Sequence, residues 1–373
     1  MNIEIYNLKT RKFITSVELN KMRVSHNLSN FTIKSRFMKA AFLETLENNK
    51  VRCTLCPHNC LLKPGETGKC TVRHNNEGTL VTETFNTVSA LSIDPVEKKP
   101  LYHFYPGTQI LSVGSFGCNM KCSFCQNHDI SQPTIDILNR RKNTLSSRQI
   151  ILEARGIDSN IGLAFTYNEP VVWYEFMKDM AVKARSEGMS TVMVSNGYIN
   201  RDPLKEIMNY INAFNIDLKA FNDNFYREIA GARLKPVLKT LIEIGRSGKH
   251  LEITYLIIPG YNDNRNEFRD CISWLHDNIG PDVVLHLSRY FPSYNFSAPP
   301  TPASTMHEMH NIAKEKINFV YPGNINIPGI MDTVCPDCGS LITSRSGYSI
   351  KHRNIENGKC TDCGRLIYKY FRN

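Results

Sequence analysis

The sequence has no apolar run that could cross a membrane, since no stretch approaches roughly 18 consecutive apolar residues. Its first residues lack the charged segment and apolar stretch of a secretory signal. Repeats and low-complexity tracts are also absent. An apolar content of 41% excludes a wholly disordered chain. These absences predict a globular cytoplasmic protein, and they argue against reading its 12 cysteines as a secreted disulfide scaffold.

Eleven of the 12 cysteines form three tight groups. The groups are Cys53, Cys56, Cys60 and Cys70; then Cys118, Cys122 and Cys125; then Cys335, Cys338, Cys360 and Cys363. In a cytosolic chain, such grouping indicates metal sites rather than disulfides. Cys271 stands alone near an apolar helical stripe, where we expect it to pack as a small hydrophobe.

The formal charge of +10 is concentrated in two segments. Residues 1–37 hold seven Lys/Arg against two Asp/Glu, and residues 335–373 hold seven against three. The middle of the sequence is therefore nearly neutral. Solvated basic segments explain this better than nucleic-acid binding, which net charge alone does not identify. Nucleic acid is disfavoured as a partner but not excluded.

Strand and helix patterns alternate between residues 110 and 321. Short apolar runs predict strands at 110–114, 161–166, 191–195, 216–219, 251–258, 283–287 and 318–321. Helical stripes predict helices at 38–46, 171–187, 236–244, 268–279 and around 309–313, and one more that is capped by Asp202 with Pro203 first. Repeated βα units predict an α/β fold with parallel strands, whose functional residues gather where strands end.

A loop of three cysteines follows the first of these strands. Cys118, Cys122 and Cys125 have CxxxCxxC spacing. Closely spaced thiolates can hold a [4Fe–4S] cube, which normally takes four cysteine ligands. Three ligands leave one iron open, and an open position separates a reactive metal site from a closed structural one. The alternative is zinc with His128 as the fourth ligand, which the position after a strand disfavours.

This loop resembles that of the radical S-adenosylmethionine (SAM) superfamily. The resemblance implies that the open iron binds SAM through its amino and carboxylate groups. It implies that reduction, by a donor such as ferredoxin or flavodoxin, cleaves SAM to a 5′-deoxyadenosyl radical that abstracts hydrogen from substrate. It also implies a partial (β/α)6 TIM-like barrel. In such chemistry the protein binds, orients and shields.

Residues at later strand ends resemble the superfamily's cofactor-contacting segments. The implied cofactor contacts are Phe124 near adenine, with Asn168, Glu169, Ser195, Asn196, Asp217 and Lys219 around the rest. Glu169 stands in the place of a Gly-Gly-Glu-like motif whose glycines are replaced by Tyr167 and Asn168. A helix N-cap would also explain Glu169, and a simple ion pair would explain Asp217 with Lys219. Their placement at successive strand ends favours the functional interpretation.

Part of the pattern also resembles the activases of glycyl radical enzymes, in Asp217-Leu218-Lys219 and in residues 257–263. Those activases carry a histidine after the sixth strand. Spacing places Phe291 there in this chain, with His286 five residues earlier. Glycyl-radical activation therefore stays an alternative, as do protein and RNA modification. Candidate substrate contacts are His103, Arg289 and Tyr290.

A narrower resemblance rests on long strings, which are VRCTLCPHNC at 51–60, DPVEKKPLYHF at 94–104, QN at 126–127, ISQ at 130–132 and CPDCG at 335–339. These strings resemble the radical enzyme of the AmmeMemoRadiSam system over about residues 38–363. The resemblance implies a Memo-like and an Ammecr-type partner. It implies no particular substrate.

The two four-cysteine groups differ in spacing. The C-terminal group has zinc-ribbon spacing, with Gly339 and Gly364 after its pairs, where the chain must turn through a left-handed conformation. A closed zinc site would stabilise a module too small to hold a core alone, and docking onto nucleic acid or protein is the disfavoured alternative. The N-terminal group suits zinc and a second, fully ligated iron–sulfur cluster equally well, with His58 as a possible substitute ligand.

The sequence thus predicts four regions. They are a basic extension at 1–37, a four-cysteine metal-binding region at 38–105, a radical SAM core at 106–325 and a zinc-ribbon-like module at 326–373. The predicted function is a radical SAM enzyme of unidentified substrate. A rival of another class is a non-catalytic zinc-binding adaptor for nucleic acid, which predicts zinc at all three sites and no cofactor binding.

Overall fold

The computed structural model describes residues 5–7, 12–14, 38–134, 143–327 and 329–372. Most of the predicted 1–37 extension lies outside these residues. Its described part is the antiparallel pair β1 (Ile5–Asn7) and β2 (Lys12–Ile14). Among the described residues, no helix has the length and apolar character needed to cross a membrane.

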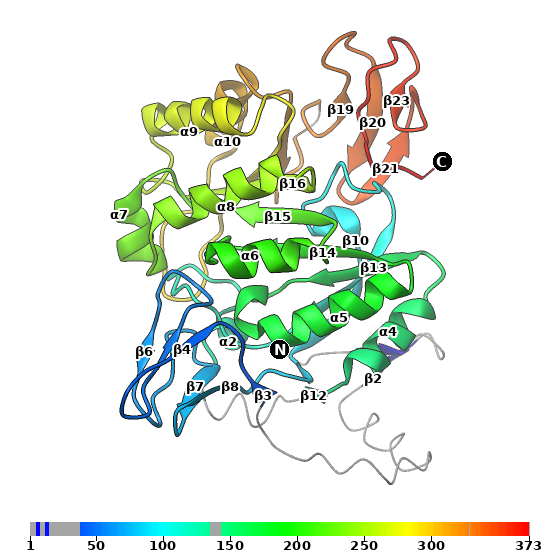
Figure 1. Ribbon diagram of the computed structural model, residues 1–373. Helices are drawn as coiled ribbons and strands as arrows, with labels where there is room; N and C mark the ends of the chain where they lie inside the picture. Colours follow the sequence, from blue (N-terminus) through cyan, green and yellow to red (C-terminus); the bar gives the residue numbers. More distant parts are fainter. Residues whose placement is uncertain (1–4, 8–11, 15–37, 135–142, 328, 373) are drawn as a thin grey trace.

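An eight-stranded sheet occupies the centre of the molecule (Figure 1). In spatial order its strands are β10 (Ala90–Pro95), β11 (Gln109–Gly114), β13 (Asn160–Phe165), β14 (Ser190–Ser195), β15 (Ala213–Asp217), β16 (His250–Ile257), β17 (Val284–Arg289) and β18 (Phe319–Gly323). Strands β11 to β18 are parallel, whereas β10 pairs antiparallel with β11. In the described part of the chain, β10 and β18 pair only with their inner neighbours, so the sheet is open between them.

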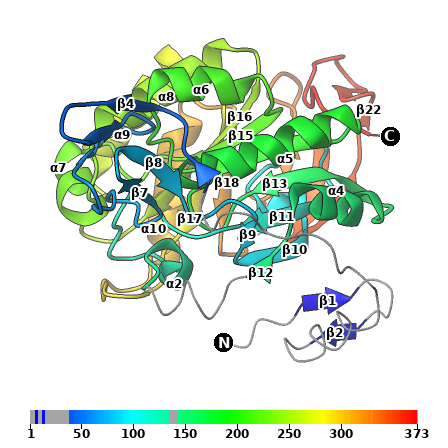
Figure 2. The same ribbon diagram turned by 60° about the horizontal axis from the view of Figure 1, so that its bottom comes forward.

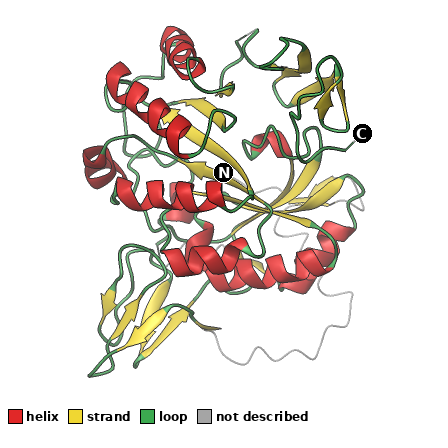
Figure 3. Ribbon diagram, turned by 45° about the horizontal axis from the view of Figure 1, so that its top comes forward, coloured by secondary structure: helices red, strands yellow, loops and turns green. Residues whose placement is uncertain are grey.

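Helices return the chain between these parallel strands and cover the outside of the sheet (Figure 3). The longer ones are α4 (Ser147–Arg155), α5 (Tyr174–Ser186), α6 (Arg201–Met208), α8 (Leu234–Arg246), α9 (Arg265–Asn278) and α10 (Ala303–Lys314). Shorter turns are η1 (Val96–Lys98), α2 (His128–Ser131), η2 (Pro170–Trp173), α7 (Asp223–Phe225) and η3 (Tyr226–Ala230). Helix α8 buries Val237, Leu241 and Ile244, a spacing that places them on one face against the sheet. The alternating strands and helices confirm the predicted α/β class with parallel strands.

The prediction of a helix at residues 38–46 is wrong. Two short strands, β3 (Met38–Lys39) and β4 (Leu43–Thr45), occupy this segment. Between them Phe42 has a left-handed backbone with φ of 57°, which breaks any helix, and its ring packs edge-on against Tyr174. Leu43 pairs with Cys53, so contacts with distant residues override local helix propensity.

Several predicted boundaries also shift by a few residues, as in α6 and β15. Helix α6 begins at Arg201 with Asn200 at the N-cap position, two residues before the predicted Asp202. The fourth parallel strand, β15, ends at Asp217 rather than at Lys219. Lys219 therefore lies in the loop that follows the strand.

Small antiparallel sheets lie on either side of the central sheet (Figure 1). The N-terminal ones contain β3, β4, β5 (Val51–Cys53), β6 (Leu61–Leu62), β7 (Arg73–Asn76) and β8 (Thr79–Thr82). The C-terminal ones contain β19 (Thr333–Val334), β20 (Leu341–Ser346), β21 (Ser349–His352), β22 (Ile355–Glu356) and β23 (Lys359–Cys360). Strands β9 (Thr87–Val88) and β12 (Asn143–Thr144) form a further pair near β10 (Figure 2).

A buried polar network joins the C-terminal strands to the central sheet. The guanidinium of Arg345 lies 4.6 Å from the ring centre of Tyr102 and 5.1 Å from that of Tyr321. Tyr321 contacts the His103 ring at 2.7 Å through its hydroxyl. The Glu252 carboxylate accepts the backbone N–H groups of Tyr102 at 2.9 Å and of His103 at 2.7 Å. The Arg345 guanidinium donates to Thr333 Oγ1 at 2.5 Å and to Tyr102 O at 3.3 Å, and the Glu252 carboxylate contacts the rings of His250 and His286. Such contacts reduce the cost of burying polar and charged groups.

Candidate functional site

The three-cysteine loop follows β11 and is held by backbone hydrogen bonds. Lys121 N donates to Ala230 O at 2.8 Å, and Ser123 N donates to Ile229 O at 3.2 Å, so η3, which follows β15 in the chain, supports the loop. Gly117 has a φ of +87°, which favours glycine, and it starts the turn into Cys118. The loop thus presents its thiols from an ordered backbone at the carboxyl end of β11.

The three thiols are mostly shielded from solvent. Cys122 is buried, and Cys118 and Cys125 are half-buried. Burial raises the pKa of the Cys122 thiol to about 11 and that of Cys118 well above its usual range. Thiolates in such a place need a cationic partner, and an iron–sulfur cluster supplies one. The donor set therefore fits the predicted cluster.

The zinc alternative for this loop finds no geometric support. Among the described residues, no three metal-ligating side-chain atoms within 4.8 Å of one another include a cysteine of this loop or His128. The His128 ring instead stacks on Tyr294, with centroids 4.4 Å apart. One zinc ion needs its ligand atoms closer together than the loop holds them.

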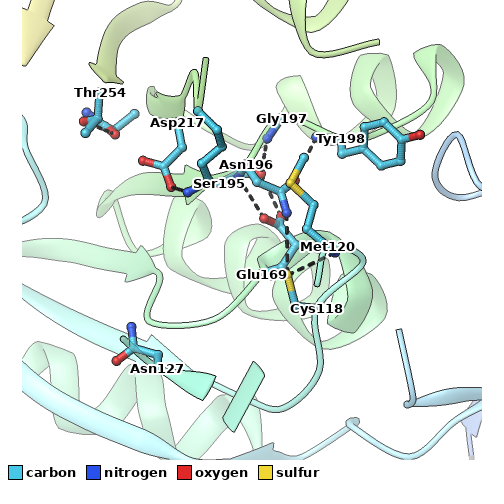
Figure 4. Close-up of polar contacts among 12 residues, drawn as sticks. Cys118, Met120, Asn127, Glu169, Ser195, Asn196, Gly197, Tyr198, Asp217 and Thr254 are labelled. Carbon is cyan, nitrogen blue, oxygen red and sulfur yellow. Dashed lines mark hydrogen bonds and ion pairs between the residues drawn. The ribbon is translucent and has the colours of Figure 1, made fainter. Parts of the chain in front are cut away.

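Glu169 lies beside the loop as a buried carboxylate (Figure 4). Its Oε1 accepts from the Ser195 hydroxyl at 2.7 Å and from Val171 N at 3.1 Å, and its Oε2 accepts from Asn196 N at 2.8 Å. Burial raises the pKa of Glu169 to about 7, although these three donors lower it in part. Glu169 is the N-cap of η2, which confirms the helix-cap alternative, and its side chain also faces the cysteine loop.

Asn196 connects this carboxylate to the cysteine loop (Figure 4). Its Nδ2 donates to Asn119 Oδ1 at 2.9 Å and approaches the Cys118 sulfur at 3.6 Å. Asn119 was not singled out from the sequence, although it lies inside the CxxxCxxC spacing. Hydrogen bonds to a ligating sulfur are one means by which a protein adjusts a cluster.

Asp217 and Lys219 form an ion pair on the other side of the site, with Lys219 Nζ 2.5 Å from Asp217 Oδ2. Burial alone would lower the pKa of Lys219, but the adjacent Asp217 carboxylate raises it above its ordinary value. The Asp217 side chain retains 31% exposure, so it faces the open part of the site. Two residues that the sequence did not single out are also drawn in Figure 4: Thr254, which pairs with Asp217 from the neighbouring strand β16 and lies beside it, and Asn127, which lies farther away.

Two of the predicted cofactor contacts, Asn168 and Phe124, make contacts with other residues of the protein. Asn168 accepts from Ser115 N at 3.0 Å and donates to Gly117 O at 2.8 Å, so it braces the start of the cysteine loop. The Phe124 ring packs with Phe225 and Phe296, each with centroids 6.0 Å away. Their direct contact with a cofactor stays a prediction.

The candidate substrate contacts have polar groups that are bonded to other parts of the protein. His103 is enclosed in the Tyr321–Glu252 network, where burial lowers its pKa to about 3. Tyr290 is buried and donates its hydroxyl to Phe296 O at 2.9 Å. Arg289 Nε donates to Thr301 O at 2.7 Å. Spacing alone could not show the partners of His103, because they are far away in sequence.

The N-terminal four cysteines line one small cavity together with His58 and Arg73. Cys53 and Cys70 are buried, and Cys56 and Cys60 are half-buried. The Nε2 of His58 lies 2.7 Å from Asn119 O, so this ring nitrogen contacts the three-cysteine loop. The four thiols are thus brought together as predicted from their spacing.

The C-terminal four cysteines form a tight cluster. Their sulfur atoms all lie within 4.8 Å of one another, with Cys335 and Cys363 at 3.5 Å and Cys338 and Cys360 at 3.6 Å. Gly339 and Gly364 have φ of +77° and +79°, which confirms the expected left-handed turns. The arrangement can hold a metal ion.

Comparisons with known proteins agree with this geometry. Residues 112–275 match the family described as "Radical SAM superfamily". The chain is 41% identical over 333 residues to "Uncharacterized protein MJ0808" of Methanocaldococcus jannaschii, which covers 88% of this chain and 98% of that protein. It is 24% identical over 156 residues to the pyruvate formate-lyase 1-activating enzyme of Escherichia coli K12, which covers 40% of this chain and 61% of that enzyme.

Among solved structures, a radical SAM methyltransferase from Sphaerobacter thermophilus is similar, with a TM-score of 0.46 and 14% identity over 88% of this chain and 86% of that one. The family match spans the cysteine loop, Glu169, Asn196 and the Asp217–Lys219 pair. From these residues and the extended similarity to its relatives, the chain belongs to the radical SAM superfamily.

Proposed function

We propose that this protein is a radical SAM enzyme in which Cys118, Cys122 and Cys125 hold a [4Fe–4S] cluster that cleaves SAM. The observation that carries the proposal is the cysteine loop at the carboxyl end of β11, with the buried Glu169 carboxylate beside it. Membership of the superfamily implies both the cluster and SAM. When bound, they would supply a 5′-deoxyadenosyl radical that abstracts hydrogen from an unidentified substrate.

The residues around the loop would bind and orient the cofactor. Glu169 is held by three donors and can accept a hydrogen bond from an ammonium group. Asn196 lies close enough to the Cys118 sulfur to donate to it. The ion pair of Asp217 and Lys219 offers one charge of each sign to a zwitterionic ligand. The curved sheet, as a partial (β/α)6-type barrel, would shield the radical.

The proposed setting follows the resemblance of the sequence strings. We place the enzyme in the cytoplasm in an AmmeMemoRadiSam system, with a Memo-like and an Ammecr-type partner and with ferredoxin or flavodoxin as reductant. The strings VRCTLCPHNC and DPVEKKPLYHF support this placement. The regions at 1–37, 38–105, 106–325 and 326–373 are proposed as its units.

Activation of a glycyl radical enzyme is the second candidate. It is supported by similarity to two such activases, at 24% and 25% identity. It is weakened by Phe291, an exposed aromatic residue at the place where spacing predicts a histidine. Formation of a glycyl radical on a partner protein would distinguish this candidate.

One assay tests the proposed function. The protein is purified without oxygen and reconstituted, and iron, sulfide and zinc are measured together with 5′-deoxyadenosine released after reduction. We expect iron, sulfide and stoichiometric release of 5′-deoxyadenosine from SAM. Zinc at all three sites without 5′-deoxyadenosine would support the nucleic-acid adaptor instead.

We further propose that Cys335, Cys338, Cys360 and Cys363 hold one zinc ion in a closed structural site. Their sulfur atoms are as close as tetrahedral coordination requires. A Cys338→Ala/Cys363→Ala variant should lose about one zinc per chain, and its residues 335–370 should become sensitive to protease, since metal binding and folding are coupled in so small a module. Cys271→Ala, which removes a buried thiol outside the three groups, should retain zinc. Unchanged zinc in the double variant would refute the site.

A further inference from the structure

The N-terminal thiols lie farther apart than the C-terminal ones. Around one zinc ion each sulfur lies about 2.3 Å from the metal, so no two sulfurs can exceed about 4.6 Å. The C-terminal group has all its ligand atoms within 4.8 Å. Among the described residues, no three of the sulfurs of Cys53, Cys56, Cys60 and Cys70 all lie within 4.8 Å of one another. The three sulfurs of the radical loop share this wider spread.

A wide spread of thiols around one cavity fits a cube of four irons. Each corner of such a cube takes its own cysteine, so the sulfurs are separated by the body of the cluster. The four N-terminal sulfurs approach one cavity, since Cys60 Sγ and Cys70 Sγ would each lie 3.8 Å from a Cβ placed on Gly68. With four thiols present, no iron of the cube would be left open for SAM.

A second observation points to a charged occupant of this cavity. Arg73 lines it and is 1% exposed. Both terminal nitrogens of its guanidinium are used, on Glu175 and on Ala41 O, but its buried Nε has no partner. An unpaired buried N–H is costly, and a four-thiolate cluster with net negative charge would accept from it.

The segment that carries Cys70 packs against the start of the radical loop. A Cβ on Gly117 would lie only 2.7 Å from Cys70 O and 2.8 Å from Val72 Cγ1, so the two loops touch at the residue before Cys118. His58, from the N-terminal loop, lies 2.7 Å from Asn119 O. The Asn119 side chain then accepts from Asn196, which also approaches Cys118.

We infer that Cys53, Cys56, Cys60 and Cys70 ligate a second [4Fe–4S] cluster, fully ligated by protein and adjacent to the radical loop. This inference does not depend on SAM cleavage, because it concerns different ligands. It goes beyond the proposed function in assigning this cavity to an iron–sulfur cluster rather than to zinc.

The test separates the two clusters by variants. Reconstituted wild-type protein should hold about eight irons and eight sulfides per chain, that is, two cubes. Cys118→Ala/Cys122→Ala/Cys125→Ala should keep about four of each, and Cys56→Ala/Cys60→Ala should also keep about four. Cys271→Ala is the matched control and should keep about eight. Circular dichroism checks that each variant is folded.

Electron paramagnetic resonance gives an independent reading of the reduced clusters. Adding SAM should change the spectrum of Cys56→Ala/Cys60→Ala, whose remaining cluster has an open iron, and leave that of the triple variant unchanged. A wild-type protein with about four irons, together with zinc retained in the triple variant beyond the C-terminal ion, would overturn the inference. If the triple variant keeps about four irons but the wild-type protein fails to cleave SAM, the proposed function would be overturned and the second cluster would stand.

Discussion

Replacing Glu169 with glutamine should weaken SAM binding about 10- to 100-fold and slow 5′-deoxyadenosine release at least as much, because a lost charge-assisted hydrogen bond and a mispaired buried amide cost about 1–3 kcal/mol. Both carboxylate oxygens already accept from protein donors. In glutamine, an NH2 group replaces one of these oxygens and faces a hydrogen-bond donor. At the Oε2 position this donor is Asn196 N–H, and at the Oε1 position the donors are Val171 N–H and the Ser195 hydroxyl. The negative charge toward the cofactor ammonium is also lost.

Equilibrium binding of SAM to the reconstituted variant, under anaerobic conditions, measures this effect. Iron content should stay at the wild-type level, because Glu169 is not expected to ligate the cluster. Glu153→Gln is the matched control, since Glu153 is exposed on α4, and it should bind SAM as wild-type protein does. Wild-type affinity in the Glu169 variant would exclude this carboxylate from the cofactor site.

Replacing Glu175 with alanine should destabilise the protein by about 3–5 kcal/mol, the usual cost of leaving a buried charge without its partner. Glu175 accepts two hydrogen bonds from Arg73, at 3.0 and 3.1 Å, and one from Ala41 N at 2.7 Å. The side chains of the pair are 1% and 7% exposed. An arginine side chain is not deprotonated in proteins, so Arg73 stays charged when its partner is removed.

Denaturation in urea and limited proteolysis both report this loss. Because the pair joins α5 to the N-terminal strands, we expect residues 38–105 to become protease-sensitive first. Glu187→Ala is the control at the other end of α5, where the pair with Arg155 is exposed and worth about 0–1 kcal/mol. Equal stability losses in the two variants would contradict a structural role for the buried pair.

The sequence allowed prediction of those parts of the fold that local pattern determines. The buried apolar runs of β11, β13, β14 and β16 and the stripes of α8 and α9 have clear periods, so their order and approximate bounds could be read directly. Strand β10 could not, because Ala90–Pro95 mixes polar and apolar residues and takes its conformation from pairing with β11. The same dependence on a distant partner explains the error at residues 38–46.

Some residues of the candidate site could also be predicted from the sequence, and others could not. Cys118, Glu169 and Asp217 were identifiable because each lies at or shortly after the end of a strand within a recognisable motif. Asn119 and Asn127 were not, since an asparagine in a loop has many local uses, and only the fold shows Asn119 bonded to Tyr198 O and Asn127 to Tyr167 O. The surroundings of His103 could not be predicted for the same reason, because its ring contacts Tyr321, more than two hundred residues later.

The Arg345 network has a consequence for how the chain folds during its synthesis. Tyr102, Glu252 and Tyr321 leave the ribosome before Arg345, at a rate of about 5–20 residues per second. Until Arg345 arrives, the faces of Tyr102 and Tyr321 that it covers lack their partner. The central sheet is therefore expected to spend several seconds as an incomplete intermediate in which this surface is accessible to chaperones.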